Sequence, residues 1–264
     1  MSAIQVVALA GDFLRHRWYA AQFATDPRFE LRAVVSERQP PARSGDTVEE
    51  ERLIAEHLAL RDQTEERYFG RAPSWEDLAE VRRVERGETN EAPTAEWVRS
   101  FEPRYLVLYG SSIIKTPLLD WFDGRTVNLH LGLSPYYKGH ATNFWPLVNG
   151  EPECVGATIH LATLSVDAGP ILRQVRPAIG LGDDNHDIGC KAIIAGSAAH
   201  RDALAAFGAG ELAPVPQQAG GRLYKRADFN AAAVVELRRR FADGMIPRYL
   251  EQKSERDARY PIVE

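Results

Sequence analysis

Cysteine is almost absent from this sequence. The 264 residues contain two, Cys154 and Cys190, both in otherwise apolar surroundings. Two cysteines cannot build a disulfide scaffold or a cysteine-rich zinc site, so we predict a location in the reducing cytoplasm. The first eleven residues show neither a basic leader nor a small-residue cleavage site, and no stretch reaches the roughly 20 apolar residues that cross a bilayer. We therefore expect neither secretion nor a membrane partner.

An excess of positive charge is also lacking. The chain has 32 Lys and Arg against 37 Asp and Glu, a formal net charge of -5. Such a balance gives no overall field that attracts phosphate backbones, so nucleic acid is a disfavoured partner. His186, Cys190 and His200 share one stretch, but no fourth ligand accompanies them, so we predict no metal site.

The glycine-rich phosphate motifs are missing as well. Gly11 follows the first apolar run alone, without the G-x-G-x-x-G pattern of dinucleotide binding, and no G-x-x-x-x-G-K-S/T occurs. A nicotinamide oxidoreductase or a kinase therefore has no support from these motifs.

What is present is the composition of an ordinary folded protein, 44% hydrophobic and 26% charged. At this length a chain hides roughly 70 to 75% of its unfolded surface, enough for a core without staples. Short apolar runs alternate with helical patterns, which is typical of strand-helix-strand units. The predicted fold is α/β, a Rossmann-like open and mostly parallel sheet flanked by helices, with a short carboxy-terminal appendage. Its strands are expected at residues 4–10, 31–35, 105–109, 126–130, 155–161 and 171–175.

The domain organisation follows from where this pattern changes. Residues 1–208 form the predicted main domain, with a helical insertion at about 39–93, and residues 209–264 form the appendage. Within the insertion, 47–68 predicts a helix that is either a solvated face or a lid or dimerisation arm, so a homodimer stays open. Residues 77–88 suggest a mobile connector. Other helices are expected at 15–24, 94–100, 117–122, 141–148 and 187–207, and a final one at 232–241.

The densest group of polar side chains lies between residues 128 and 169. Asn128 and His130 flank Leu129, so on a strand both project from one face at its carboxyl end, where α/β sheets bind ligands. Asp167 is the single acid in a loop between two apolar strands. An amide, an imidazole and a carboxylate that converge suit acyl transfer to an amine. The amide stabilises the oxyanion, the imidazole stabilises it or moves a proton, and the carboxylate orients the imidazole and raises its pKa. Each residue taken alone is equally typical of a structural strand or turn residue.

Three ordered motifs carry a resemblance to a known family. They are Asn128-Leu129-His130, then Pro135-Tyr136-Tyr137-Lys138-Gly139, then Asp167-Ala168-Gly169, with 37 positions between His130 and Asp167 (167 minus 130). In this order they resemble the 10-formyltetrahydrofolate-dependent formyltransferases, such as methionyl-tRNA formyltransferase and the sugar N-formyltransferases. The resemblance implies a Rossmann-like catalytic domain, with Asn128, His130 and Asp167 as the catalytic residues.

The same resemblance implies two binding regions. The segment after the strand at 105–109 resembles the family's folate-binding strand end, and the 10-formyltetrahydrofolate site it implies comprises Tyr109, Gly110, Ser111, Ser112, Ile113, Leu164 and Val166. The implied acceptor contacts are Gly11, Asp12, Arg15, Tyr137, Lys138 and Thr142, for each of which a packing or surface role is an equal alternative.

The acceptor that this layout favours is a small molecule. Many relatives have Ser-Leu-Leu-Pro where this chain has Gly132-Leu133-Ser134-Pro135, so the contacts of the family serine are not carried over. The tail contains Gly220-Gly221-Arg222-Leu223-Tyr224, which resembles small-amine formyltransferases, and no strand pattern of a tRNA-binding barrel. We predict an N-formyltransferase acting on an amino sugar, a sugar nucleotide or an amino-acid-derived metabolite. The alternatives are a 10-formyltetrahydrofolate hydrolase and a catalytically silent folate or sugar-nucleotide binding module.

Overall fold

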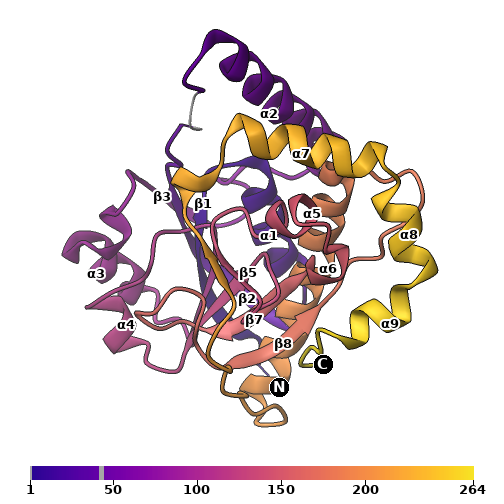
Figure 1. The fold of residues 1–264 in the computed structure, drawn as a ribbon. Helices are drawn as coiled ribbons and strands as arrows, with labels where there is room; N and C mark the ends of the chain where they lie inside the picture. Colours follow the sequence, from indigo (N-terminus) through magenta and orange to yellow (C-terminus); the bar gives the residue numbers. More distant parts are fainter. Residues whose placement is uncertain (1, 42–44) are drawn as a thin grey trace.

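A seven-stranded sheet forms the centre of the computed structural model, which describes residues 2–41 and 45–264 (Figure 1). The strand order is β3-β2-β1-β4-β5-β7-β8, in which all neighbours up to β5 are parallel and β7 and β8 are antiparallel. The strands are β1 (Ile4–Gly11), β2 (Phe29–Glu37), β3 (Glu80–Val84), β4 (Tyr105–Tyr109), β5 (Thr126–His130), β7 (Ala157–Leu161) and β8 (Ile171–Val175). A separate parallel pair joins β6 (Tyr137–Gly139) to β9 (Arg222–Tyr224).

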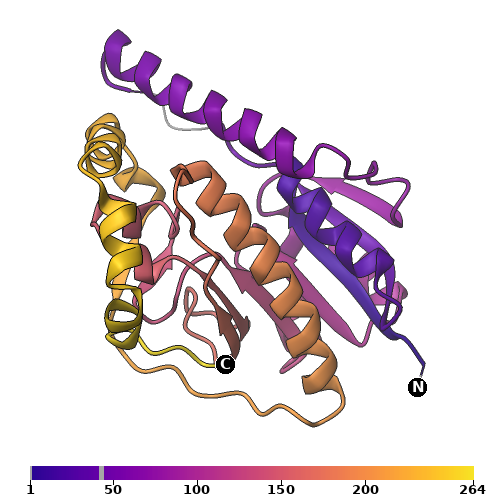
Figure 2. The same ribbon diagram turned by 90° about the vertical axis from the view of Figure 1, so that its right-hand side faces the viewer.

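Successive side chains of a strand point to opposite faces of the sheet. Both faces of this sheet are apolar, and helices cover both. In β1, Val6 and Ala8 pack with α1 (Leu14–Thr25) and α6 (Asn185–Gly208), whereas Val7 and Leu9 pack with α3 (Ala92–Ser100) and α4 (Leu118–Trp121). Figure 2 shows α6 running diagonally across one face of the sheet. Among the described residues, no helix combines the length and apolarity needed to cross a bilayer.

The carboxy-terminal segment builds a second core against this layer. It comprises α7 (Ala231–Ala242), α8 (Met245–Glu251) and α9 (Lys253–Ala258). Val234 and Tyr249 of this segment share a buried cluster with Trp145 of α5 (Trp145–Val148), with Ile188 of α6 and with Ile54 of α2 (Val48–Phe69). The helices of residues 209–264 therefore rest on the preceding chain, and the division at residue 208 stays a prediction.

The predicted strands are confirmed, with bounds that differ by a few residues, and so is the α/β class. Three predictions were wrong. Residues 77–88 are not a loose connector, because they contain the edge strand β3, so the segment 39–93 is not purely helical. The helix at 141–148 is limited to α5, and the helix at 232–241 is followed by α8 and α9. Residues 42–44 of the segment 39–93 lie outside the described residues.

A histidine fills the point where the strand order reverses. Between β1 and β4, the buried ring of His16 packs edge-on against Tyr109, with 4.7 Å between ring centroids. Its Nδ1 accepts a hydrogen bond from the Phe13 N–H at 3.2 Å. A Cβ at Gly11 or Gly110 would lie within 2.5 Å of the ring, so only glycine allows this approach. Dinucleotides bind at this crevice in Rossmann enzymes. Here the side chain of His16 occupies the crevice, which disfavours such a ligand.

Candidate active site

The carboxyl end of β5 presents two polar side chains on one face. Asn128 and His130 are two residues apart on this strand and therefore point the same way. Leu129 points to the opposite face, where it belongs to the core packed against α6. The neighbouring strand β7 runs antiparallel, which places His160 directly opposite Asn128.

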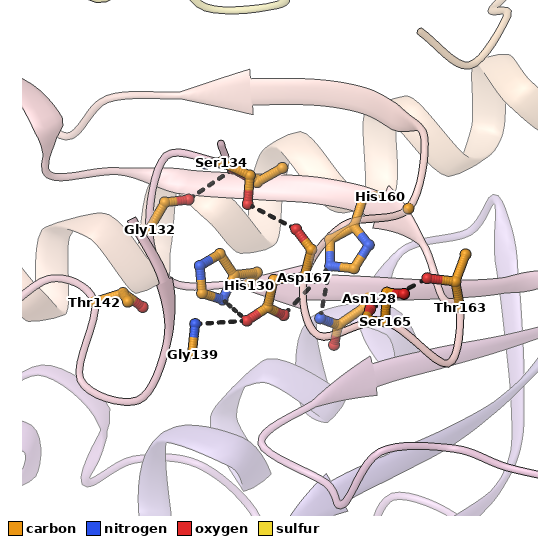
Figure 3. Close-up of polar contacts among 12 residues, drawn as sticks. Asn128, His130, Gly132, Ser134, Gly139, Thr142, His160, Thr163, Ser165 and Asp167 are labelled. Carbon is orange, nitrogen blue, oxygen red and sulfur yellow. Dashed lines mark hydrogen bonds and ion pairs between the residues drawn. The ribbon is translucent and has the colours of Figure 1, made fainter. Parts of the chain in front are cut away.

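Asp167 closes the group from a loop between β7 and β8. Its Oδ2 lies 3.2 Å from Nδ1 of His130 and accepts a hydrogen bond from the Gly139 N–H at 2.9 Å. Its Oδ1 lies 3.6 Å from Nε2 of His160. Figure 3 shows the carboxylate between the two imidazoles, with the Asn128 amide beside His160. The structure therefore brings together all three side chains that the sequence nominated as catalytic.

The charge states follow from burial and from these contacts. Burial would by itself raise the pKa of Asp167, but attraction to His130 and the hydrogen bond from the Gly139 N–H outweigh it, so the pKa is well below its usual value. Burial lowers the pKa of His130, against the opposing attraction of Asp167, and the charge of Lys138 lowers it further. Asp167 is thus a carboxylate and His130 a neutral imidazole at pH 7. Asp167 does raise the pKa of His130, as the sequence predicted, but burial outweighs this effect because the residue is only about 6% exposed.

Both ring nitrogens of His130 face an oxygen. Nδ1 faces Asp167, and Nε2 lies 3.0 Å from the carbonyl oxygen of Tyr137. A neutral imidazole can donate to only one of them, whereas the imidazolium formed by taking up a proton would donate to both. The arrangement therefore suits an imidazole that is neutral at rest and is stabilised as a cation during the reaction.

Sequence reasoning missed His160. Its Nδ1 donates to the Leu161 carbonyl at 2.9 Å, which leaves Nε2 as the acceptor of the Asn128 amide at 3.0 Å. The ring thereby fixes the rotation of the amide whose N–H groups would meet an oxyanion. In the sequence, His160 is a single histidine within an apolar strand. That it lies opposite Asn128 follows only from the antiparallel register of the two strands.

A buried network supports the turn between His130 and Gly139. Ser134 donates from its hydroxyl to the Asp167 carbonyl at 3.2 Å and from its N–H to Oγ1 of Thr158 at 3.0 Å. Gln174 on β8 donates from Nε2 to the Ser134 carbonyl at 2.6 Å, and its Oε1 accepts from the Val263 N–H at 3.1 Å. Ser134 thus connects the turn with the Asp167 loop, although this chain departs from the family sequence at that position.

The residues predicted to bind the folate flank β5. Tyr109 ends β4, and residues 110–113 follow it, while Leu164 and Val166 belong to the loop after β7; β4 and β7 are the two neighbours of β5. Ile113, Leu164 and Val166 expose 45%, 68% and 38% of their surface, so apolar side chains of both segments are accessible to a ligand. The Tyr109 side chain is instead buried in the core.

The residues predicted to bind the acceptor fall into two groups. Asp12 is exposed and follows the end of β1, and Lys138 is half-buried and lies in β6. Arg15 is paired with Glu65 of α2 at 2.5 Å. Tyr137 and Thr142 are buried, with hydroxyls bonded to Glu151 and to the Leu131 carbonyl, which favours a structural role for both. Gly11 is buried beneath His16.

Two hollows on the surface lie away from these side chains. The larger, about 690 Å³, is bounded by β8, α6 and the carboxy-terminal segment, and the other is lined by Glu96, Arg99, Ser100 and Glu102. Within the described ranges, no three His, Cys, Asp or Glu side chains are grouped to hold a metal ion.

Comparison with known proteins gives one family. A model described as formyl transferase matches residues 30–201, well over half of the chain. The methionyl-tRNA formyltransferase of Corynebacterium urealyticum is 30% identical over 230 residues, which cover 81% of this chain and 64% of that protein. That of Myxococcus xanthus is 32% identical over 158 residues, covering 56% of this chain and 50% of that protein. The matches thus span between half and two thirds of these relatives' length.

Solved structures share the fold at low identity. The phosphoribosylglycinamide formyltransferase of Anaplasma phagocytophilum superposes with a TM-score of 0.56 at 15% identity, over 84% of this chain and 98% of that one. A sugar N-formyltransferase from Shewanella sp FDAARGOS_354 gives 0.55 at 15% identity, over 85% of this chain and 78% of that one. The formyltransferase PseJ from Anoxybacillus kamchatkensis, in complex with UDP-4,6-dideoxy-4-formamido-L-AltNAc and tetrahydrofolate, gives 0.50 at 18% identity, over 84% of this chain and 87% of that one.

Proposed function

Since this chain belongs to the formyl transferase family, we propose that it transfers a formyl group from 10-formyltetrahydrofolate to the amine of a small molecule. The observation that carries the proposal is the convergence of Asn128, His130 and Asp167 at the carboxyl end of β5. These groups offer a donor for an oxyanion, a base that is neutral at rest and a carboxylate that holds the base.

The reaction would proceed by addition and elimination. The amine nitrogen attacks the formyl carbon, and the carbonyl oxygen gains the charge that an N–H of Asn128 meets. His130 takes the proton released by the amine, and Asp167 stabilises the imidazolium so formed. The bond from the formyl carbon to N10 then breaks, and N10 receives the proton as tetrahydrofolate leaves. No covalent enzyme intermediate is needed.

The donor would lie against residues 110–113 and the loop that carries Leu164 and Val166. The exposed apolar side chains of this surface suit the flat face of a pterin. The N–H groups of Ser111 and Ile113 have no hydrogen-bond partner among the described residues, so they are available to the ring's polar edge. A relative of the same fold was solved with tetrahydrofolate.

The acceptor would enter between the β1–α1 turn and the turn that follows β6. The pKa of His140 is lowered, first by desolvation and then by Arg226, Arg86 and Arg15, so three guanidinium groups lie within electrostatic reach of it. This charge favours an anionic acceptor such as an amino sugar linked to a nucleotide. Residues 209–264 form one short strand and three α-helices rather than a five-stranded barrel, which supports a small acceptor over a tRNA.

The test is direct. The protein is incubated with 10-formyltetrahydrofolate and a panel of amino sugars, sugar nucleotides and amino-acid amines, and products heavier by one formyl group are sought by mass spectrometry. The Asn128→Ala variant serves as the control for non-enzymatic formylation. Formate release at the same rate with and without any amine would contradict the transferase and indicate a hydrolase.

A further inference from the structure

The segment that follows β4 is held in place by side chains from a different part of the sheet. We name residues 110–115 the donor loop, because the proposed function places the formyl donor against them. Three polar side chains of residues 37–90 hydrogen-bond to four of its main-chain groups. These residues lie at the end of β2 and in the turn after β3 (η1, Glu88–Asn90). Since β1 lies between β2 and β4, their contacts with the donor loop pass over the carboxyl end of β1.

Glu37 makes the strongest of these attachments. It ends β2, and its carboxyl group is fully buried. Oε2 accepts from the Ser112 N–H at 2.5 Å, and Oε1 accepts from the Ser112 hydroxyl at 2.5 Å and from the Gly87 N–H at 2.6 Å. Among the described residues, no Lys, Arg or His forms an ion pair with it. A carboxyl group buried without a cation is stabilised only by such donors, so its position and that of Ser112 depend on each other.

Asn90 and Gln39 hold the two ends of the same loop. Asn90 donates from Nδ2 to the Ile113 carbonyl at 3.0 Å, and its Oδ1 accepts from the Lys115 N–H at 2.7 Å. Gln39 donates from Nε2 to the Gly110 carbonyl at 3.0 Å. The Ser111 and Ile113 N–H groups are left without a partner among the described residues. The attachments thus fix the backbone on both sides of each unpaired N–H.

We infer that Glu37 and Asn90 are positioning residues for the formyl donor, and this inference rests on the proposed function. They touch no reacting atom. Their hydrogen bonds hold the donor loop so that its unpaired N–H groups keep one orientation toward the pterin. The donor loop is ordered during folding, so binding of the donor carries no further entropy cost for ordering it. The loss of an attachment adds this cost to binding, and we therefore expect the affinity for the donor to weaken more than any other property.

Two variants of nearly unchanged shape test this. Glu37→Gln turns an amide NH2 toward donors that need an acceptor, and Asn90→Asp sets a carboxylate oxygen against the Ile113 carbonyl while it keeps the bond from Lys115. Glu85→Gln is the matched control, since Glu85 lies on the same segment but is 64% exposed and pairs only with Arg38. Binding of tetrahydrofolate is measured by calorimetry, and KM for donor and acceptor is measured separately.

We expect Kd for tetrahydrofolate and KM for the donor to rise roughly tenfold or more in both variants, with the acceptor KM nearly unchanged. Equal rises in both KM values with a lowered thermal midpoint would show a merely structural role and overturn the inference, as would unchanged tetrahydrofolate affinity in both variants. A wild-type protein that binds tetrahydrofolate but formylates no amine would contradict the proposed function and leave this inference standing. A wild-type protein that does not bind tetrahydrofolate would overturn both.

Discussion

At the scale of single residues, Asp167 lies at the centre of the proposed catalytic group. It contacts both imidazoles and the Gly139 N–H, and it adopts a left-handed backbone conformation, φ 47°, that few non-glycine residues take. Its loop is therefore fixed by contacts at both the side chain and the main chain, including the hydroxyl of Ser134. A carboxylate held in this way keeps the His130 ring in one orientation at every stage of a proton transfer.

Removing the amide of Asn128 should affect catalysis more than binding. The Asn128→Ala variant loses the donor aimed at the oxyanion, which typically costs about 2.7 to 4 kcal/mol in the transition state, so turnover should fall by about two to three orders of magnitude. Single-turnover rates with saturating donor measure this effect. Gln252→Ala, which truncates an exposed amide far along the chain, is the control. A variant that keeps near wild-type turnover would remove Asn128 from the mechanism.

The pH profile should report the state of His130. Because burial lowers its pKa, the imidazole is neutral at pH 7, and turnover should fall only as pH drops through that lowered value, below about 6.5. In Asp167→Asn the attraction that opposes this lowering is lost. The acid limb should then move to still lower pH, and turnover should fall by about 10²–10⁴-fold. Both proteins are compared with one acceptor, so the titration of its amine is common to both. An acid limb displaced upward would contradict the assigned roles.

At the scale of elements, the packing of α6 on the sheet sets the position of β5. Gly196 of α6 faces Leu129, the residue between Asn128 and His130. A Cβ at Gly196 would lie 2.7 Å from the Ala157 Cβ and 2.9 Å from Leu129 Cδ1. The helix approaches the strand this closely because the glycine has no side chain, and the approach holds the back of the catalytic strand.

Two glycines of the same helix should therefore respond in opposite ways. In Gly196→Ala, overpacking of about 1–3 kcal/mol should outweigh the gain of up to about 1 kcal/mol in helix propensity, and turnover should fall because Leu129 is displaced. In Gly189→Ala the new Cβ meets nothing within 4 Å, so this variant should be stabilised by up to about 1 kcal/mol. Urea unfolding gives both free energies. Equal effects of the two substitutions would show that the close approach is not what matters.

At the scale of the whole molecule, neutral histidines are built into the interior. Six histidines are less than 10% exposed, and in five of them burial is the largest cause of a lowered pKa. These five are His16, His57, His130, His186 and His200. They come from β5 and from α1, α2 and α6, so the protonation of any one of them disturbs packing that several elements share.

Acid should therefore destabilise the fold well before the carboxylates titrate. For His57 and His200, whose pKa values are lowered to about 3, the unfolded chain binds a proton between about pH 6.5 and pH 3 that the folded chain does not. The free energy of unfolding therefore falls as pH falls, by up to about 1.4 kcal/mol per pH unit for each of these two histidines. The thermal midpoint should decline steadily from pH 7.5 to pH 5.5. In His200→Gln the free energy of unfolding should depend less steeply on pH, by the contribution of one proton. A midpoint that stays constant over this range would contradict the prediction.

Local pattern was enough for much of the molecule. Strands such as 105–109 and 126–130 were predictable because a strand buried on both faces is a short run of β-branched and apolar residues between turns. The pairing of Asn128 with His130 on one face follows from the two-residue period of a strand. The edge strand β3 was missed because its sequence, Glu80–Val84, is mostly charged and lies at the exposed margin of the sheet, where burial leaves little imprint.

The amino-acid sequence by itself determined the α/β class, the order of most elements and the choice of the three side chains proposed as catalytic, because periodicity and residue chemistry are local properties. Only the tertiary structure decided that His160 stands opposite Asn128, that burial outweighs the effect of Asp167 on the pKa of His130, and that Tyr137 is buried. It also decided that Glu37 holds a loop 75 residues away. The physical reason is that burial and strand register depend on which distant segments come into contact, and a local sequence pattern does not contain that information.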